Sequence, residues 1–269
     1  MEPLFPRHVQ SDDAEIAYWA LGDGPPVLLL HPFPVHHEFW IPVAEALSTR
    51  FRLILPDLRG HGESGAGNGP ATMERHAADL IRVMNAAEIE RVPIIGVSIG
   101  GYILFEFWRR HRERIAALGL CNTKALADNA EARAGRLKAA EDVLERGTEQ
   151  FFEGMVQKVL SKTTLENRPD RKNAAIQMMR KTSKEKVAQV QRGMAARPDS
   201  VATLKTISVP TLIVTGDEDG LTGVNEAELM RQHISGSQMR VIRRAGHYAP
   251  WEQPEEATRV FRNFLDNSL

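Results

Sequence analysis

The chain of 269 residues is predicted to fold as an α/β protein with a mostly parallel central sheet, helices on both faces and an inserted helical lid. Short apolar runs alternate with amphipathic segments over roughly the first 120 residues, and the same alternation returns after residue 205. The segment between these two parts is rich in Ala, Lys, Arg, Glu and Met. No strand is expected there, so this middle segment is interpreted as a helical insertion.

The expected strands are short and apolar. Nearly continuous apolar runs indicate strands that are buried on both faces, as in a parallel sheet. Such runs occupy residues 26–30 (PVLLL), 51–55 (FRLIL), 92–97 (VPIIGV), 115–120 (IAALGL) and 211–215 (TLIVT). Further strands are expected at residues 15–20 and 239–243.

Helical patterns separate these strands. They cover residues 36–48, 73–87, 99–111, 224–233 and 254–266. Within the insertion, helices are expected at 127–144, 147–160 and 183–196, with a break at 167–170. Residues 1–122 and 206–269 are therefore expected to form a core domain, and residues 123–205 a helical cap.

Composition limits the possible partners and compartments. The formal net charge is -1, so no global field favours nucleic acid or an anionic membrane as a partner. The single cysteine, Cys121, can form no internal disulfide, which favours a reducing compartment. The N-terminal residues do not have the pattern of a signal peptide, and no apolar stretch is long enough to span a membrane. A soluble cytoplasmic protein is expected.

The segment Gly96-Val97-Ser98-Ile99-Gly100 has the pattern of a sharp turn that exposes a nucleophilic serine. An expected strand precedes it and an expected helix follows it, which is the context that this turn requires. Side chains at positions 96 and 100 would collide with the neighbouring strand and helix, so both residues are glycine. The turn is expected to hold Ser98 in a strained conformation at the helix N-terminus.

Two further segments follow strands at the same edge of the sheet. His247 follows the last expected strand, and Asp217, Glu218 and Asp219 directly follow residues 211–215. The carboxyl edge of an open α/β sheet is where ligands bind and where Ser98 would emerge. A lone histidine is more often structural, and three acids in a row are usually a solvated turn. The chain order of serine, acid and histidine nevertheless matches a known catalytic arrangement.

An oxyanion that forms during acyl transfer needs backbone N–H donors. The loop His31-Pro32-Phe33-Pro34 follows an expected strand and can supply one donor. The N–H of Ile99, the residue after the nucleophile, is the expected second donor.

Five ordered motifs resemble those of the α/β-hydrolase fold family, in the branch of small esterases, lactonases, perhydrolases and C–C hydrolases. They are LLLHPFP, LILPDLRGHGES, GVSIGG, PTLIVTGDEDGLT and AGHYAPWEQPEE, and the resemblance covers residues 14–266. It implies that the acid is the fourth residue of G-x-x-D, which selects Asp219 over Asp217 and Glu218. Some members carry the acid after the strand that here ends near Leu120, but this chain has no carboxylate at 121–123.

The resemblance also identifies the donor loop. The family usually has His-Gly where this chain has His31-Pro32, and proline has no N–H to donate. The N–H of Phe33 is therefore carried over as the first donor, and the imidazole of His31 is expected to brace the loop.

The resemblance implies a serine hydrolase that cleaves small carboxylic esters or lactones through an acyl-enzyme. Ser98 would be the nucleophile, His247 the general base and Asp219 the acid that orients the base. No metal or organic cofactor is expected. Hydrolysis of C–C bonds, hydrolysis of enol-lactones and perhydrolysis would use the same triad. Hydroxynitrile cleavage and a non-catalytic ligand-binding protein of the same fold are more distant alternatives.

Aromatic and methionine side chains are candidates for the substrate pocket. Tyr248 is expected to shape its entrance, and ordinary packing is the alternative for the others. The candidates are Trp40, Phe151, Phe152, Met155, Met194 and Tyr248. The polar residues of the DLRGHGES segment are expected to form an ion-paired loop rather than to contact substrate. His36 and His37 are expected at a helix start or on the surface, because the sequence offers no further metal ligands beside them.

Overall fold

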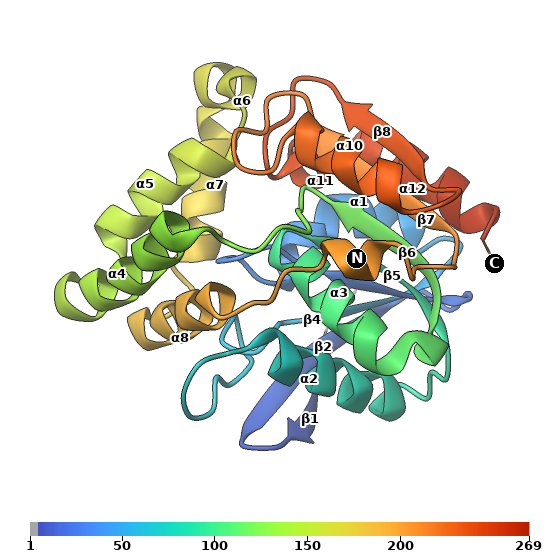
Figure 1. Cartoon of the computed structure of the whole chain (residues 1–269), viewed down its shortest axis with the longest axis horizontal. Helices are drawn as coiled ribbons and strands as arrows, with labels where there is room; N and C mark the ends of the chain where they lie inside the picture. Colours follow the sequence, from blue (N-terminus) through green and yellow to red (C-terminus); the bar gives the residue numbers. More distant parts are fainter. Residues whose placement is uncertain (1–4, 269) are drawn as a thin grey trace.

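In the computed structural model, which describes residues 5–268, an eight-stranded sheet has the order β1-β2-β4-β3-β5-β6-β7-β8 (Figure 1). The strands β3 to β8 are parallel, whereas β1 and β2 pair antiparallel at one edge. The mostly parallel sheet predicted from the apolar runs is thus confirmed. The strands are β1 Arg7–Ser11, β2 Ala14–Leu21, β3 Pro26–Leu30, β4 Arg52–Pro56, β5 Val92–Val97, β6 Ile115–Cys121, β7 Thr211–Gly216 and β8 Gln238–Ile242.

Helices cover both faces of the sheet, as predicted. Strand β4 lies on one side of β3 in the sheet, whereas β5 and β6 lie on the other side. Because crossovers between parallel strands are right-handed, α1 covers one face of the sheet and α2 and α3 cover the opposite face. The helix α12 packs against α1, and α2 packs against α3. The bounds are η1 His37–Trp40, α1 Ile41–Leu47, α2 Met73–Ala86, α3 Ile99–His111, η2 Arg112–Arg114, α9 Val201–Leu204, α10 Val224–His233, α11 Ala249–Glu252 and α12 Pro254–Asp266.

Six helices lie between β6 and β7, and the first five of them gather beyond one end of the sheet (Figure 1). These five are α4 Ala130–Arg146, α5 Glu149–Val159, α6 Lys162–Asn167, α7 Pro169–Met179 and α8 Lys184–Ala195. We call α4 to α8 the cap helices. Three of them were predicted, whereas α6 and α7 occupy a region where only a break was expected. The break is a single residue, Arg168, after which Pro169 begins α7.

Hydrogen bonds join the cap helices to the core at several places, among them the end of α5 and the helix α8. At the end of α5, the hydroxyl of Ser161 donates to Oε2 of Glu252 (2.7 Å). On α8, Nζ of Lys186 donates to the carbonyl of Gly62 (2.8 Å), and Nε2 of Gln189 donates to the carbonyl of Gly67 (3.0 Å). The insertion is therefore attached to α11 on one side and to the segment between β4 and α2 on the other.

The structure differs from the sequence-based prediction at two short elements. The strand β1 was not predicted, because its sequence RHVQS is mostly polar and the strand lies exposed at the sheet edge. The helix predicted at 36–48 is a 3-10 turn followed by α1, which begins at Ile41-Pro42. No helix within residues 5–268 combines the length and the apolar character needed to cross a bilayer.

Candidate active site

Ser98 stands on the turn between β5 and α3, with φ 56° and ψ -111°. A positive φ is costly for a residue with a side chain, so the predicted strain is present. A Cβ on Gly96 would lie 2.6 Å from the carbonyl carbon of Gly100, and a Cβ on Gly100 would lie 3.0 Å from Cβ of Leu30. Both glycines are thus required by close contacts with α3 and β3, as the motif predicts.

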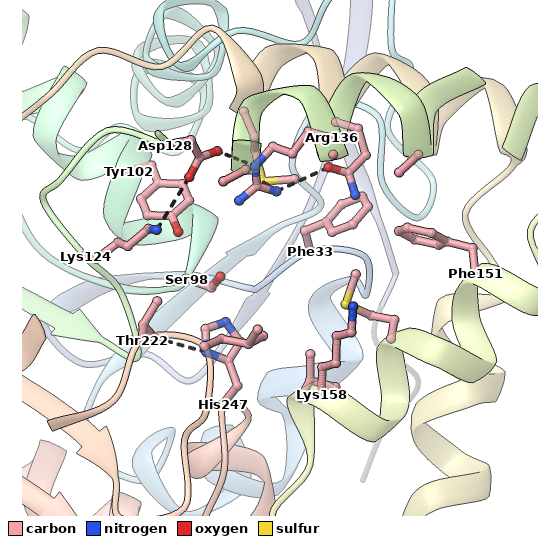
Figure 2. Close-up of a pocket in the computed structure, with 18 residues that line it drawn as sticks. Phe33, Ser98, Tyr102, Lys124, Asp128, Arg136, Phe151, Lys158, Thr222 and His247 are labelled. Atoms are coloured by element: carbon pink, nitrogen blue, oxygen red, sulfur yellow. Dashed lines mark hydrogen bonds and ion pairs between the residues drawn. The ribbon is translucent and has the colours of Figure 1, made fainter. Parts of the chain in front are cut away.

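The imidazole of His247 is held by Asp219. Its Nδ1 lies 3.0 Å from Oδ2 and 3.2 Å from Oδ1 of this carboxylate. If Nδ1 carries the proton, the other ring nitrogen is left as an acceptor. Figure 2 shows Ser98 and His247 at the same cavity, which both residues line.

Asp219 receives several other hydrogen bonds. Its Oδ2 accepts from Nδ2 of Asn122 (2.9 Å) and from the hydroxyl of Thr222 (2.8 Å), and its Oδ1 accepts from the N–H of Leu221 (2.8 Å). Burial opposes ionisation of this carboxyl group. The charge of His247 and the hydrogen bonds from His247, Asn122 and Leu221 outweigh burial and hold the pKa of Asp219 well below its usual value. The acid is therefore ionised at neutral pH.

The two neighbouring acids have different partners. Oδ1 of Asp217 accepts from the N–H of Ala245 (3.3 Å). Glu218 accepts from both the N–H (2.9 Å) and the hydroxyl (2.5 Å) of Thr163 in α6, which joins this turn to the cap. Within the described residues only Asp219 of the three contacts His247, in agreement with the choice that the family resemblance implied.

The two expected oxyanion donors are free. The N–H groups of Phe33 and Ile99 have no acceptor within residues 5–268. Ile99 is the first residue of α3, so its N–H has no partner inside the helix. Buried N–H groups are rarely left without partners, and their presence beside Ser98 is consistent with a ligand oxygen as their acceptor.

The loop that carries Phe33 is braced from two sides. Nδ1 of His31 lies 2.9 Å from the carbonyl of Pro32, and its Nε2 accepts from the N–H of Leu58 (2.9 Å). Burial holds the pKa of His31 well below its usual value, so the ring is neutral and can accept this bond. The hydroxyl of Tyr248 donates to the carbonyl of Phe33 (3.0 Å). His31 thus has the expected bracing position.

A cavity of about 380 Å³ lies between the strand ends and the cap helices. Met155 and Met194 line it, as does Phe151, in agreement with the prediction for these three residues (Figure 2). The full lining consists of Phe33, Ser98, Tyr102, Lys124, Asp128, Ala132, Gly135, Arg136, Ala139, Phe151, Met155, Lys158, Val159, Gln191, Met194, Leu221, Thr222 and His247.

The other three predicted pocket residues do not line this cavity. Trp40 is fully buried and packs edge-on against Phe39 and Phe261. Phe152 is fully buried in the cap. Of the two adjacent residues Phe151 and Phe152, Phe151 lines the cavity and Phe152 does not. Tyr248 is buried behind Phe33, so it supports the donor loop instead of facing the ligand space. Ordinary packing, the alternative considered for Trp40 and Phe152, describes these two residues, whereas Tyr248 supports the loop that carries Phe33.

Sequence reasoning missed several residues of the site. Asn122 and Thr222 hold Asp219. Asn122 belongs to no motif, and Thr222, the last residue of PTLIVTGDEDGLT, was given no role. Tyr102 lines the cavity one helical turn after Ser98, and this spacing was an available signal. The charged lining residues Lys124 and Arg136 come from the insertion, where no motif marks them.

The DLRGHGES segment forms the ion-paired loop that was expected. Asp57 accepts from the backbone N–H of His37 (2.7 Å) and contacts its Nδ1 (2.8 Å), and Arg59 pairs with Asp79 (2.5 Å). His36 is buried and caps η1, so a helix-start role is correct and a surface position is wrong.

A third potential metal ligand was not foreseen beside the histidine pair. Ligand atoms of His36, His37 and Glu38 lie within 4.8 Å of one another. Nδ1 of His37 is already bound to Asp57, and Glu38 pairs with Lys181 (2.8 Å). These existing contacts account for the polar cluster.

Comparison with known proteins gives relatives that include an esterase and two enol-lactonases. A thermophilic esterase from Thermogutta terrifontis, with malate bound, is 38% identical with a TM-score of 0.95, over 98% of this chain and 99% of the esterase. The enol-lactonase from Burkholderia xenovorans is 25% identical with a TM-score of 0.90, over 97% and 100% of the two chains. The 3-oxoadipate enol-lactonase 1 of Acinetobacter baylyi is 27% identical over 90% of this chain and 89% of its own length.

The family model of the α/β hydrolase fold matches residues 25–254, a span that includes the turn at Ser98, the loop of Phe33 and the residues Asp219 and His247. The strand order, the strained turn and the histidine–carboxylate pair described above agree with this match. The chain belongs to the α/β hydrolase fold family.

Proposed function

We propose that this protein hydrolyses small carboxylic esters or lactones, with Ser98 as nucleophile, His247 as general base and Asp219 as the acid that orients the base. The main support for this proposal is that Ser98 and His247 line the same cavity. Ser98 is strained and partly exposed, and His247 is hydrogen-bonded to the carboxylate of Asp219. A serine hydroxyl is a weak nucleophile on its own, and a neighbouring imidazole activates it.

The mechanism follows from these positions. His247 accepts the proton of the Ser98 hydroxyl as its oxygen attacks the acyl carbon, and Asp219 stabilises the imidazolium that forms. The N–H groups of Phe33 and Ile99 donate to the oxyanion of the tetrahedral intermediate. The protonated His247 then supplies a proton to the leaving alcohol. Water, activated by the same imidazole, releases the acyl group and restores the serine.

The relatives support this choice of reaction. The predicted enzyme class, a hydrolase of ester bonds, is confirmed by the esterases and enol-lactonases among them. An enol-lactone is itself a cyclic ester, so the enol-lactonase relatives favour lactones as a specific second candidate within the same chemistry. Hydrolysis of C–C bonds and perhydrolysis would use the same triad but gain no support from an observation particular to this chain.

We also propose that residues 123–205 act as a cap domain over a core of residues 1–122 and 206–269. The helices α4, α5 and α8 contribute Arg136, Met155 and Met194, respectively, to the cavity lining. Substrate selection would then depend on the cap, whereas the reacting groups come from the core.

A fluorophosphonate probe tests the proposed nucleophile directly, because it reacts with an activated serine and needs no knowledge of the substrate. We expect a single adduct, located by mass spectrometry on the peptide that contains Ser98. The His247→Gln variant should label at least about a hundredfold more slowly, since general-base assistance typically contributes that much. A folded wild-type protein that is not labelled, or an adduct on another serine, would contradict the proposal.

A further inference from the structure

Charged side chains around the cavity are mostly cationic. Lys124, Arg136 and Lys158 line the cavity that contains Ser98, and Asp128 is the one carboxylate among the lining residues of this cavity (Figure 2). The chain as a whole has a formal net charge of -1, so this excess of positive charge is local. The apolar part of the lining, including Phe33, Phe151 and Met155, lies beside these cations.

Asp128 does not neutralise its neighbours. Its carboxylate is approached by Nε of Arg136 (2.5 Å), Nη2 of Arg197 (2.9 Å) and Nζ of Lys124 (3.5 Å). Only 3% of the Asp128 side chain is exposed, so water screens this cluster little. Three cations therefore share one carboxylate, and positive charge remains next to the ligand space.

Lys158 adds a further cation from α5. Its ammonium group has no hydrogen bond or ion pair within the part of the chain that the structure describes, and Figure 2 shows it directed into the cavity. Several other lysines of the cap helices have partners, for example Lys138 with Asp142 (3.0 Å), whereas Lys172 of α7 has none within the described residues and does not line the cavity. An unpaired ammonium at the mouth of an apolar cavity is positioned to receive an anion.

We infer that the cavity selects esters or lactones that carry a carboxylate remote from the bond to be cleaved, and that Lys158, supported by Arg136, binds this carboxylate. The inference rests on the proposed function and specifies its substrate class. A carboxylate would compensate the unmatched charge through charge-assisted hydrogen bonds, which are stronger than neutral ones. The carbon chain between the two ends of the substrate would contact Phe151 and Met155.

The test compares two esters of equal acyl length, monophenyl adipate and phenyl hexanoate, by release of phenol. We expect wild-type kcat/KM to be about tenfold higher for the anionic ester, the size of effect that one partly exposed charge-assisted bond gives. In Lys158→Gln this preference should fall about tenfold, whereas Lys138→Gln, which removes an exposed cap lysine outside the cavity, should keep it. Added salt should reduce the preference in the wild type.

Binding to the Ser98→Ala variant separates recognition from turnover. Calorimetry should show that monophenyl adipate binds this variant more weakly by about tenfold when Lys158→Gln is added. If the wild type hydrolyses phenyl hexanoate as fast as monophenyl adipate and binding does not depend on Lys158, the inference is wrong and the proposed function stands. If Lys158-dependent binding is found but neither ester is hydrolysed, the proposed function is wrong and the carboxylate site stands.

Discussion

Among the three consecutive acids Asp217, Glu218 and Asp219, the hydrogen bonds to His247 distinguish Asp219 from the other two. Asp219 holds Nδ1 of the imidazole and is itself held by Asn122 and Thr222, so the ring orientation is fixed on the side away from the cavity. The hydroxyl of Thr222 also lies 3.1 Å from Nδ1 of His247. The orientation of His247 therefore depends on Asp219, Asn122 and Thr222, and Asn122 lies outside every motif.

Asparagine substitutions at the neighbouring acids test this assignment. Asp219→Asn should lower kcat by about a thousandfold or more, because the amide favours the wrong tautomer of His247 and cannot stabilise the imidazolium. Asp217→Asn should change kcat by no more than a few-fold, since Asp217 makes one long bond to Ala245 (3.3 Å). Ester hydrolysis by the two purified variants measures the difference. Equal losses would mean that the wrong carboxylate was chosen.

Motifs with fixed spacing led to Ser98, His247 and Asp219 as candidates. The structure places His247 beside Asp219 and places Ser98 and His247 at the same cavity. Pocket residues were predicted less well. Trp40 does not line the cavity because it packs against Phe261, which is distant in sequence. Tyr248 does not line it because its hydroxyl group donates a hydrogen bond to the carbonyl of Phe33, which is also distant in sequence. Such pairings depend on tertiary contacts that periodicity does not encode.

At the scale of elements, the helix α8 determines how closely the cap approaches the core. The N–H of Ala71 donates to the carbonyl of Gln189 (3.1 Å), and a Cβ on Gly193 would lie 1.9 Å from the carbonyl oxygen of Ala71. Glycine at 193 therefore permits a backbone contact between α8 and the segment before α2. The neighbouring residue Met194 lines the cavity, so this contact also positions part of the ligand space.

Two glycine-to-alanine substitutions in cap helices should have opposite effects. Gly193→Ala should lower the free energy of unfolding by about 1 to 3 kcal/mol, because the added methyl group forces α8 away from Ala71. Gly154→Ala should raise it by about 0.5 to 1 kcal/mol, because a Cβ there meets nothing within 4 Å and alanine is the better helix former. Urea unfolding of both variants measures these changes. Stabilisation by Gly193→Ala would contradict the close contact.

Elements buried on both faces were predicted well, because a parallel strand under two layers of helices needs a continuous apolar run, and β3 and β5 have one. The strand β1 and the helices α6 and α7 were missed for a common reason. They lie at the edge of the sheet or in the exposed cap, where few apolar residues are required, so their sequences carry little periodic signal.

On the scale of the whole molecule, the core contains a group of buried histidines. His31, His61 and His76 are each no more than 1% exposed, and the rings of His31 and His61 lie 4.9 Å apart. Burial lowers the pKa of His61 to about 4 and holds the pKa of His76 well below its usual value. The folded protein therefore keeps these rings neutral at pH values where the unfolded chain protonates them.

Stability should consequently fall on mild acidification. Below the unfolded pKa of about 6.5 the unfolded state binds more protons, so each such histidine costs up to about 1.4 kcal/mol per pH unit until its folded pKa is reached. Urea unfolding at pH 7 and pH 5 should show this loss, and the loss should be smaller by about 1 to 2 kcal/mol in His76→Leu.

A histidine with an exposed side chain provides the control. The side chain of His111 is 32% exposed, and His111→Gln should keep the wild-type dependence on pH. If His76→Leu loses as much stability as the wild type between pH 7 and pH 5, buried histidines do not govern the acid response.

Ser98 is proposed to perform nucleophilic catalysis at the junction of core and cap. The most direct test is hydrolysis of 4-nitrophenyl butyrate by the wild type and by Ser98→Ala, with urea unfolding to verify that the variant is folded. We expect turnover by the wild type and a loss of about a thousandfold or more in the variant, with nearly unchanged stability. A folded Ser98→Ala variant that hydrolyses the ester at the wild-type rate would contradict this proposal.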